Sequence, residues 1–351
     1  MSTDLDQSTV ALVESPAQLL NVMEWWHVSG TSRQRFAVVV LAPRQEVSRL
    51  QLRRMAGLAR GVGLAVQWHE PRLGGASTAR TVRSLAAVLS GVHRLILGDP
   101  FSGVMQVVLN ISRPREVVIV DDGSATVEFA RQHAAGEDLA RWHRRGRSDA
   151  RGQVLDFARG QLGSSARRRL AHGSGCQLTL FTSMPLQLAA VSVVRNDFAW
   201  VRDRFSAPTV KKCGDLIGTS LVETGVVDLD HYVAGVRSLA DQHSIDRYFA
   251  HRKEDPAKLA TIARHGLEIV SPDLPLEIVA RRDSIGRSVI SFPSTVVHTL
   301  PLVLSDTAAR LSVCDIADDW YTQEAPPRWQ LFLGQVSTSA RTSHGLLSVA
   351  C

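Results

Sequence analysis

The stretch Val117-Val118-Ile119-Val120-Asp121-Asp122-Gly123 decides the fold of this chain of 351 residues. Its first four residues are apolar, and because successive side chains of a strand point to opposite faces, this strand needs cover on both. Two carboxylates and a glycine follow at its end. This pattern is typical of a parallel sheet, in which ligands and catalytic groups gather beyond the carboxyl ends of the strands.

Toward the amino terminus, apolar runs at residues 10–13, 36–41, 64–68 and 95–97 alternate with helical stretches. The pair Ser15-Pro16 predicts a helix start, with serine as the N-cap and proline at the first helical position. Apolar residues recur three, four and seven positions apart in the helical stretches. Strands that are apolar on both faces and separated by helices predict a parallel α/β domain.

The second half of the chain repeats this alternation. We expect strands at residues 177–182, 215–218, 245–250, 267–270, 288–292 and 311–314. We expect helices at residues 228–240, 256–265, 275–281 and 295–300. Two consecutive parallel α/β domains fit the GT-B fold, in which two Rossmann-like domains face a cleft, and they also fit other two-lobed α/β proteins such as periplasmic-type binding proteins.

The expected domain boundaries follow changes in sequence character. Residues 1–135 form the first Rossmann-like domain, residues 136–175 an arginine-rich connector, residues 176–320 the second Rossmann-like domain and residues 321–351 a C-terminal tail. The connector carries nine arginines between positions 141 and 169 and ends at a hinge-like Gly173-Ser174-Gly175.

Composition restricts the class of partner. The formal net charge is +6, and only four of the 40 basic residues are lysines. Arginine binds phosphate and carboxylate through a planar fork, so anionic partners are favoured, although genome composition and a solvated surface account for the same bias. The arginine-rich region contains only two aromatic residues, Trp142 and Phe157, so no nucleic-acid partner is expected.

The amino terminus and the apolar runs indicate where the protein works. The first fifteen residues carry acidic side chains and no basic segment followed by an apolar run, so no signal peptide is expected. No apolar stretch approaches the ~20 residues of a membrane span. Four cysteines lie without metal-ligand spacing and are expected to be free thiols. These features favour a cytoplasmic protein.

Six segments, in order along the chain, carry a family resemblance. They are 14–21 (ESPAQLLN), 120–123 (VDDG), 216–223 (LIGTSLVE), 248–254 (YFAHRKE), 275–277 (PLE) and 292–295 (FPST). Together they resemble the bacterial lipooligosaccharide sialyltransferases and capsular α-2,8-polysialyltransferases. The sequence departs from that family at Ala250, where many relatives carry proline, and His251 is followed by arginine rather than by proline.

The resemblance implies a GT-B glycosyltransferase with an inverting, metal-independent reaction. Sialic acid or a related nonulosonic acid would pass from a CMP-sugar to a glycan or glycolipid acceptor, with no cofactor. The second domain would bind the CMP donor, and the first would lie on the acceptor side. Two other functions stay open: a transferase of the same fold that uses a UDP-hexose, and a non-enzymatic protein that binds anions or nucleic acid.

The resemblance also implies which residues bind CMP. His251, beside Arg252, and the pair Ser294-Thr295 would contact the phosphate. Each set follows an expected strand, and Ser294-Thr295 opens an expected helix, where backbone N–H groups favour an anion. The alternatives are a surface histidine in a charged loop and an ordinary helix N-cap.

Glu277 lies in the first turn of an expected helix and would accept hydrogen bonds from the ribose hydroxyls, as acidic residues do in other nucleotide folds. The resemblance places a nucleotide-binding carboxylate at this position. The alternative is a carboxylate that only complements the helix dipole.

Asp121 and Asp122 are the candidate catalytic residues. Two adjacent side chains of a strand point to opposite sides, so at most one faces a cleft. That carboxylate would take the proton from the acceptor hydroxyl as it attacks the donor. The resemblance selects Asp121 as the base, and the alternative is a turn that ends the strand.

The arginines between Arg141 and Arg169 suggest one further partner. They would hold the protein against anionic lipid at the inner face of the membrane, or they belong to a solvated connector. The sequence leaves both interpretations open.

Overall fold

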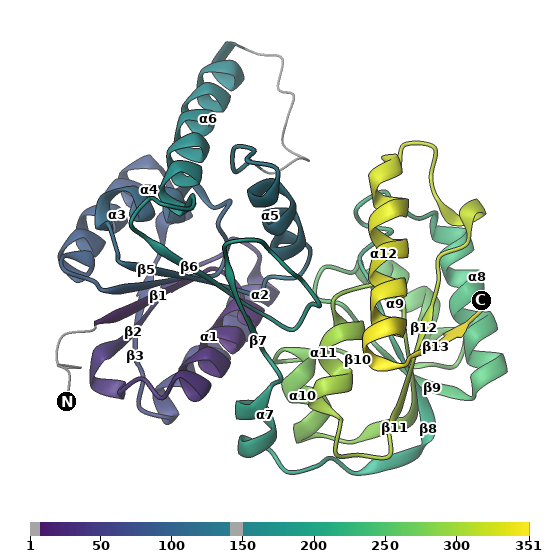
Figure 1. Ribbon diagram of the computed structural model, residues 1–351. Coiled ribbons are helices and arrows are strands. Elements are labelled where there is room, and N and C mark those ends of the chain that lie inside the picture. Colours follow the sequence, from purple (N-terminus) through teal and green to yellow (C-terminus); the bar gives the residue numbers. More distant parts are fainter. Residues whose placement is uncertain (1–7, 141–149, 351) are drawn as a thin grey trace. The chain divides into compact units, whose positions relative to one another are not determined.

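The computed structural model describes residues 8–140 and 150–350. These divide into two compact units, Met1–Asn196 and Asp197–Cys351, each built on one sheet (Figure 1). All strand pairs in both sheets are parallel, which confirms the predicted fold class of two parallel-sheet α/β domains. The predicted cleft between the domains stays a prediction.

The first sheet has seven strands in the order β3-β2-β1-β4-β5-β6-β7. The strands are β1 (Thr9–Val13), β2 (Phe36–Leu41), β3 (Ala65–His69), β4 (Arg94–Leu97), β5 (Glu116–Val120), β6 (Gln177–Thr182) and β7 (Ser192–Arg195). The helices are α1 (Pro16–Ser29), α2 (Glu46–Gly61), α3 (Gly75–Leu89), α4 (Gly103–Ser112), α5 (Ser124–Ala134) and α6 (Ala150–Leu170).

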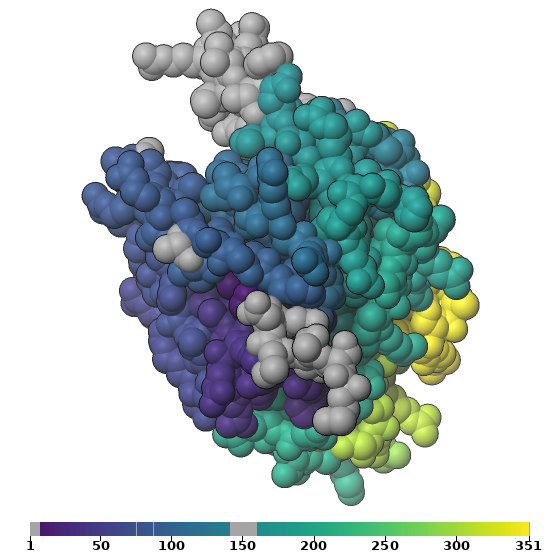
Figure 2. Space-filling view, turned by 60° about the vertical axis from the view of Figure 1, so that its left-hand side comes forward, coloured from purple at the N-terminus to yellow at the C-terminus, as the bar shows by residue number. Residues whose placement is uncertain are grey.

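Burial explains why the central strands of the first unit are apolar throughout. Every residue of β1 and all but the first residue of β4 and β5 are buried, because helices cover both faces of the sheet. In Figure 2 the blue segments of this unit lie next to the purple segments from the start of the chain. Ser15 caps α1 by accepting a hydrogen bond from Gln18 N, as predicted.

The second sheet has six strands in the order β10-β9-β8-β11-β12-β13. The strands are β8 (Val210–Ile217), β9 (Ile245–Phe249), β10 (Glu268–Val270), β11 (Ile285–Ser291), β12 (Arg310–Cys314) and β13 (Leu347–Val349). The helices are α7 (Ala199–Arg204), α8 (Leu229–His243), α9 (Pro256–Ala263), α10 (Leu276–Arg282), α11 (Val296–Val303) and α12 (Pro327–His344).

Both sheets share one topology. The first strand of each unit lies in the middle of its sheet, between the second and the fourth strands, so the chain reverses its direction of winding there. In open parallel sheets, ligands bind beyond the carboxyl ends of the strands at this reversal point. The relevant edges are therefore the ends of β1 and β4 in the first unit and the ends of β8 and β11 in the second.

The predicted boundary at residue 175 is wrong. Strand β6 pairs with β5 in the first sheet, β7 pairs with β6, and the division between the units falls after Asn196. Strand pairing overrides the glycine-rich turn that suggested a hinge, because Gln177 N continues the ladder by donating to Arg115 O.

Most of the described part of the predicted arginine-rich connector is helix α6 of the first unit. Along α6, Ser165 Oγ donates to Asn110 Oδ1 on α4, and Arg167 pairs with Asp138 at 3.1 Å. Gly163 lies so near Leu139 O that a Cβ there would stand 2.6 Å from it. Residues 141–149 of this prediction lie outside the described residues.

The predicted C-terminal tail is also wrong. Residues 321–351 contain α12 and β13, and β13 pairs with β12 at the edge of the second sheet. Val336 and Ala340 of α12 are buried against Val297 of α11 and Val313 of β12. A short strand after an amphipathic helix completes the same alternation as the rest of the chain.

Two expectations concern cysteines and membrane spans. Cys176 and Cys213 are free thiols, as expected, but Cys314 is disulfide-bonded, and Cys351 lies outside the described residues. Within residues 8–140 and 150–350, no helix combines the length and the apolar character that a bilayer crossing requires.

Candidate functional site

The carboxyl edge of the second sheet collects most of the predicted binding residues. Strand β8 lies between β9 and β11, and neighbouring strands are about 4.8 Å apart. The end of β9 leads to His251, the end of β8 to Gly218-Thr219, and the end of β11 to Ser294-Thr295. The structure thus places both predicted phosphate-binding loops on the same edge, one on each side of the β8 loop.

The hydrogen bonds of His251 define its protonation state. Lys253 N donates to His251 Nδ1 at 3.3 Å, so this ring nitrogen is an acceptor. Burial, together with the positive charges of Arg252, Lys253 and Lys258, lowers the pKa of His251 to about 3. The imidazole is therefore neutral at physiological pH, with its proton on Nε2, and can donate one hydrogen bond from that atom.

Arg252 is half-buried in the loop that follows His251. Its charge contributes to the lowered pKa of the imidazole, which places the guanidinium in the electrostatic environment of the ring. A neutral donor and a neighbouring cation are the two kinds of group that bind a phosphate without a metal.

The other loop unites Ser294, Thr295 and Glu277. Thr295 is the N-cap of α11, and both hydroxyl residues are half-buried. Thr299, one turn further along α11, donates from Oγ1 to Glu277 Oε1 at 2.8 Å. The carboxylate of α10 therefore lies against the first turns of α11, next to the helix end that favours an anion.

Asp121, in the first unit, is a buried acceptor at the end of β5. Asp121 is only 4% exposed. Asp121 Oδ2 accepts hydrogen bonds from Thr182 Oγ1 at 2.9 Å and from Ser183 Oγ at 3.2 Å. Asp121 Oδ1 accepts from Gly123 N, and the backbone oxygen of Asp121 accepts from Asn21 Nδ2. The carboxylate connects the ends of β5 and β6.

Asp122 occupies a different environment from its neighbour. It is half-buried, its Oδ1 accepts from Ser15 Oγ at 3.4 Å, and its backbone N–H donates to Thr126 Oγ1. The two carboxylates therefore point into different surroundings, as adjacent residues of an extended chain must. Both predicted catalytic residues lie in the first unit, and the five predicted binding residues lie in the second.

Glu14 is a residue at the first unit's reversal point that the sequence did not identify. It follows β1, pairs with Arg72 at 2.7 Å and accepts from Ser102 Oγ at 2.7 Å. Burial raises its pKa, and the nearby Asp99, at the end of β4, acts in the same direction. Glu14 stands within the ESPAQLLN segment, so its motif was a signal, but no chemical role could be read from it.

A second group that the sequence analysis missed lies beneath the His251 loop. Buried Tyr232, Tyr248, Glu254 and Lys258 form a hydrogen-bonded cluster with Glu223. Tyr248 and Glu254 belong to the YFAHRKE segment and Glu223 to the LIGTSLVE segment. The segments were recognisable, but the contact between them depends on the pairing of β8 with β9.

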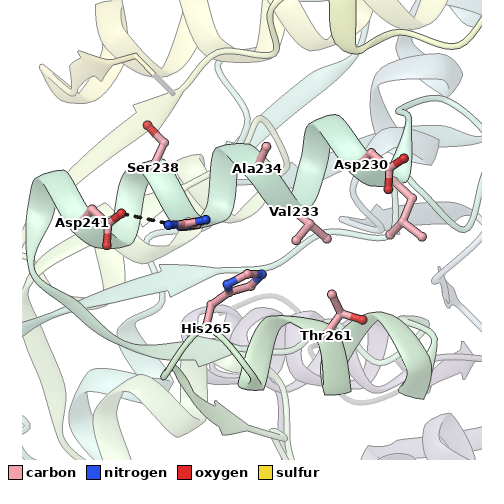
Figure 3. A pocket seen from close by; sticks show the side chains of 9 residues that line it. Asp230, Val233, Ala234, Ser238, Asp241, Thr261 and His265 are labelled. Atoms are coloured by element: carbon pink, nitrogen blue, oxygen red, sulfur yellow. Dashed lines mark ion pairs between the residues drawn. The ribbon is translucent and has the colours of Figure 1, made fainter.

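A pocket of about 600 Å³ lies elsewhere on the second unit, between α8 and α9 (Figure 3). Asp230, Ser238 and Asp241 line it from α8, and Thr261 and His265 line it from the α9 side. Arg237 and Asp241 form an exposed ion pair at 3.9 Å. None of the predicted site residues lines this pocket. Among the described residues, no group of three or more His, Cys, Asp or Glu side chains could hold a metal ion.

Comparisons with known sequences give no family. No protein-family profile matches this sequence. No curated protein matches it either.

Comparisons with solved structures bear on the fold. A protein assigned as a UDP-N-acetylglucosamine 2-epimerase from Listeria monocytogenes has a TM-score of 0.53 at 10% identity, over 99% of this chain and 92% of that one. A 2,6-sialyltransferase from a Photobacterium species, solved with CMP and lactose, has a TM-score of 0.49 at 9% identity, over 97% and 78%. A sialyltransferase from Photobacterium damsela has a TM-score of 0.46 at 9% identity, over 98% and 82%. The two parallel α/β units, together with the first of these likenesses, identify the fold as GT-B.

Proposed function

We propose that this protein is an inverting glycosyltransferase that transfers sialic acid or a related nonulosonic acid from a CMP-sugar to a glycan acceptor. One observation carries the proposal: a neutral His251, with its proton on Nε2, lies on the same sheet edge as the amino-terminal end of α11 and Glu277. The resemblance of six sequence segments to bacterial sialyltransferases supports CMP as the nucleotide.

The proposed donor site is an anion clamp. When the sugar leaves, the phosphate of CMP gains a negative charge, and groups placed where that charge grows lower the barrier. His251 donates from Nε2, Arg252 supplies positive charge, and Ser294 and Thr295 supply hydroxyl groups beside the helix end. Glu277 accepts hydrogen bonds from the ribose. These groups suffice for a donor site that needs no divalent metal.

The proposed acceptor chemistry takes place on the first unit. Asp121 or Asp122 accepts the proton of the acceptor hydroxyl while its oxygen attacks the anomeric carbon. A bond forms between the acceptor oxygen and that carbon, and the bond to the CMP phosphate oxygen breaks. A single displacement inverts the anomeric configuration.

A thermal-shift comparison tests this function. CMP, UDP, GDP and a short oligonucleotide are added in turn, with and without EDTA, to the whole chain. A ligand at 100 times its Kd stabilises the protein by roughly 2.7 kcal/mol. We expect CMP to raise the Tm and EDTA to leave that shift unchanged.

Other outcomes select the alternatives. A larger shift with UDP would identify a UDP-sugar transferase of the same fold. A shift with the oligonucleotide alone would identify a nucleic-acid-binding protein. A CMP shift that EDTA removes would overturn the metal-independent site.

A further inference from the structure

Glu254 connects the His251 loop to the interior of the second unit. Its side chain is fully buried, and Oε1 accepts from His251 N at 3.1 Å. Glu254 N donates in return to His251 O at 2.9 Å, so two hydrogen bonds close the turn between these residues. Gly218, at the end of β8, leaves the space for this arrangement, since a Cβ there would stand 2.4 Å from Glu254 Oε1.

A chain of hydroxyl groups runs from the same carboxylate to the β8 loop. Tyr248 OH donates to Glu254 Oε2 at 3.0 Å, and the hydroxyls of Tyr248 and Tyr232 are 2.7 Å apart. Thr219 N donates to Tyr232 OH at 3.3 Å. Since the single hydroxyl hydrogen of Tyr248 goes to the carboxylate, the hydrogen between the two tyrosines must come from Tyr232, whose oxygen accepts from Thr219 N. Every donor in the chain therefore points toward the carboxylate.

This order holds only while Glu254 is ionised. A protonated carboxyl must donate its own hydrogen, but both groups that contact its oxygens are donors. If Tyr248 turned to accept that hydrogen, one tyrosine hydroxyl hydrogen would be left without an acceptor in this chain. Protonation thus weakens both contacts, because the neutral carboxyl is a poorer acceptor for His251 N and the hydroxyl chain that begins at Thr219 N loses its charged end.

Several charged and titratable groups face Glu254. Tyr248 approaches from β9, Tyr232 from α8, Lys258 from α9, and Glu223 from the segment after β8, while His251, Arg252 and Lys253 share its loop. Lys258 Nζ lies 3.7 Å from Glu254 Oε2 and also contacts Glu223 and Thr219 O. Burial, opposed by Lys258 and by the two hydrogen bonds, raises the pKa of Glu254 to about 7. Both tyrosines have pKa values well above 10 and stay protonated.

We propose that Glu254 is a positioning residue: its carboxylate holds the His251 and Thr219 loops in the conformation that binds the donor phosphate, and its protonation releases them. The release makes anion binding at this edge dependent on pH, although His251 itself stays neutral. The part that concerns the donor rests on the proposed function, whereas the part that concerns the two loops does not.

The first experiment needs no ligand. The amide resonances of His251 and Thr219 are followed by NMR from pH 5.5 to 8.5 in the whole chain. We expect both to shift with one midpoint near pH 7 in the wild type and to show no such transition in Glu254→Gln. Tyr248→Phe removes one hydrogen bond to the charged carboxylate, so its midpoint moves to higher pH.

The second experiment measures CMP affinity over the same pH range. With a midpoint near 7, about one molecule in eleven is ionised at pH 6, so the Kd should be about tenfold weaker at pH 6 than at pH 8. The CMP phosphate has its own second ionisation near pH 6. Its contribution to the pH dependence of the Kd is removed by subtracting the Glu254→Gln series. Glu268→Gln, an exposed change on β10, is the matched control and should follow the wild type.

The two experiments separate the two proposals. If the two amides shift but CMP does not bind, the role of Glu254 is retained and the proposed function is rejected. CMP binding with an identical pH profile in the wild type and in Glu254→Gln would reject the role of Glu254. Thermal unfolding of each variant checks its fold, and Tyr248→Phe decides the question if Glu254→Gln does not fold.

Discussion

Thr299 Oγ1 donates a 2.8 Å hydrogen bond to Glu277 Oε1 and thereby links α11 to α10. This contact occupies one carboxylate oxygen of Glu277. A carboxylate has about four lone-pair sites, so this hydrogen bond by itself does not exclude a ribose. The same contact would also suit a purely structural brace between the two helices, and two variants distinguish the roles.

Glu277→Gln should weaken CMP binding, because an amide oxygen accepts hydrogen bonds less strongly than a carboxylate and the amide nitrogen cannot accept at all. We expect the Kd to rise about tenfold in calorimetry, on the order of 1.4 kcal/mol. Thr299→Val removes only the brace and should change the Kd by less than about threefold, within the range of one neutral hydrogen bond. Equal losses in both variants would make Glu277 a structural residue.

His251→Gln and His251→Asn test which ring nitrogen contacts the donor. The amide of glutamine can replace the Nε2 donor, whereas the shorter asparagine replaces only the group at Nδ1, which accepts from Lys253 N. Calorimetry should therefore give a larger loss of CMP affinity for asparagine than for glutamine. The reverse order would place the functional contact at Nδ1.

The stability of the protein should also change with pH through His251. Its pKa is lowered to about 3 in the folded state, so between this value and the unfolded value near 6.5 the unfolded chain binds more protons. Stability gained from the neutral ring is thus complete above about pH 6.5 and is lost as the pH falls toward 3. Urea titrations at pH 4.5 and 7 measure the free energy of unfolding. The part of the difference between these two pH values that comes from His251 should be absent in His251→Gln. An unchanged difference between the two pH values would show that the ring does not titrate as described.

Asp121→Asn should abolish transfer while CMP affinity stays nearly unchanged. A general base acts in the transition state and contributes about 10²–10⁴ in rate. The structure adds a second effect, because the new amide would point a donor toward Thr182 and Ser183. Kinetic measurements are therefore paired with thermal unfolding. Thr182→Val serves as the control that disturbs this contact without changing the carboxylate, and loss of activity in Asp122→Asn alone would assign the base to Asp122.

Arg247→Met should destabilise the second unit strongly. Arg247 makes two 2.8 Å hydrogen bonds to Asp215, whose side chain is fully buried. Breaking a buried pair at one partner costs about 3–5 kcal/mol, and this is measured by urea unfolding. Burial raises the pKa of Asp215, so part of the loss should be recovered as the pH falls. The double variant with Asp215→Asn should also recover stability, and no recovery by either route would contradict this account.

Membrane attachment is best tested at Arg168. Arg167 pairs with Asp138 and Arg169 donates to Asn110 O, whereas Arg168 is exposed. If the helix binds anionic lipid, Arg168→Gln should reduce co-sedimentation with anionic liposomes at low salt. Each charge near the surface contributes about 1 kcal/mol to the binding free energy. Neutral liposomes are the control. If sedimentation does not depend on salt, or does not occur, membrane attachment is rejected and the arginines are structural or solvated residues.

The strands were predictable because each central strand is buried on both faces. The runs at residues 36–41 and 177–182 coincide with β2 and β6. The sheet that a strand joins was not predictable, because β6 has the same pattern as the strands of either unit. Only its pairing with β5 assigns it to the first unit. Short edge strands such as β7 and β13 are largely exposed and lack the apolar signal.

The places of the candidate site residues in the fold were predictable where a residue follows a strand within a recognisable segment. His251, Asp121 and Ser294 all lie at carboxyl strand ends. The sequence could not give the contacts around these residues, because Thr182 donates to Asp121 from another strand and Tyr232 of α8 contacts Tyr248 of β9. It also could not give the protonation of His251, since that depends on a backbone donor and on burial.

The pairing of β13 with β12 sets a practical limit on engineering the protein. A shortened chain that ended at residue 320 would lack α12 and β13, and it would uncover both Val313 and the hydrogen-bonding edge of β12. An exposed strand edge beside apolar surface is a template for pairing with another chain. Such a variant would be recovered as aggregates, so affinity tags and truncations should leave the final helix and strand intact.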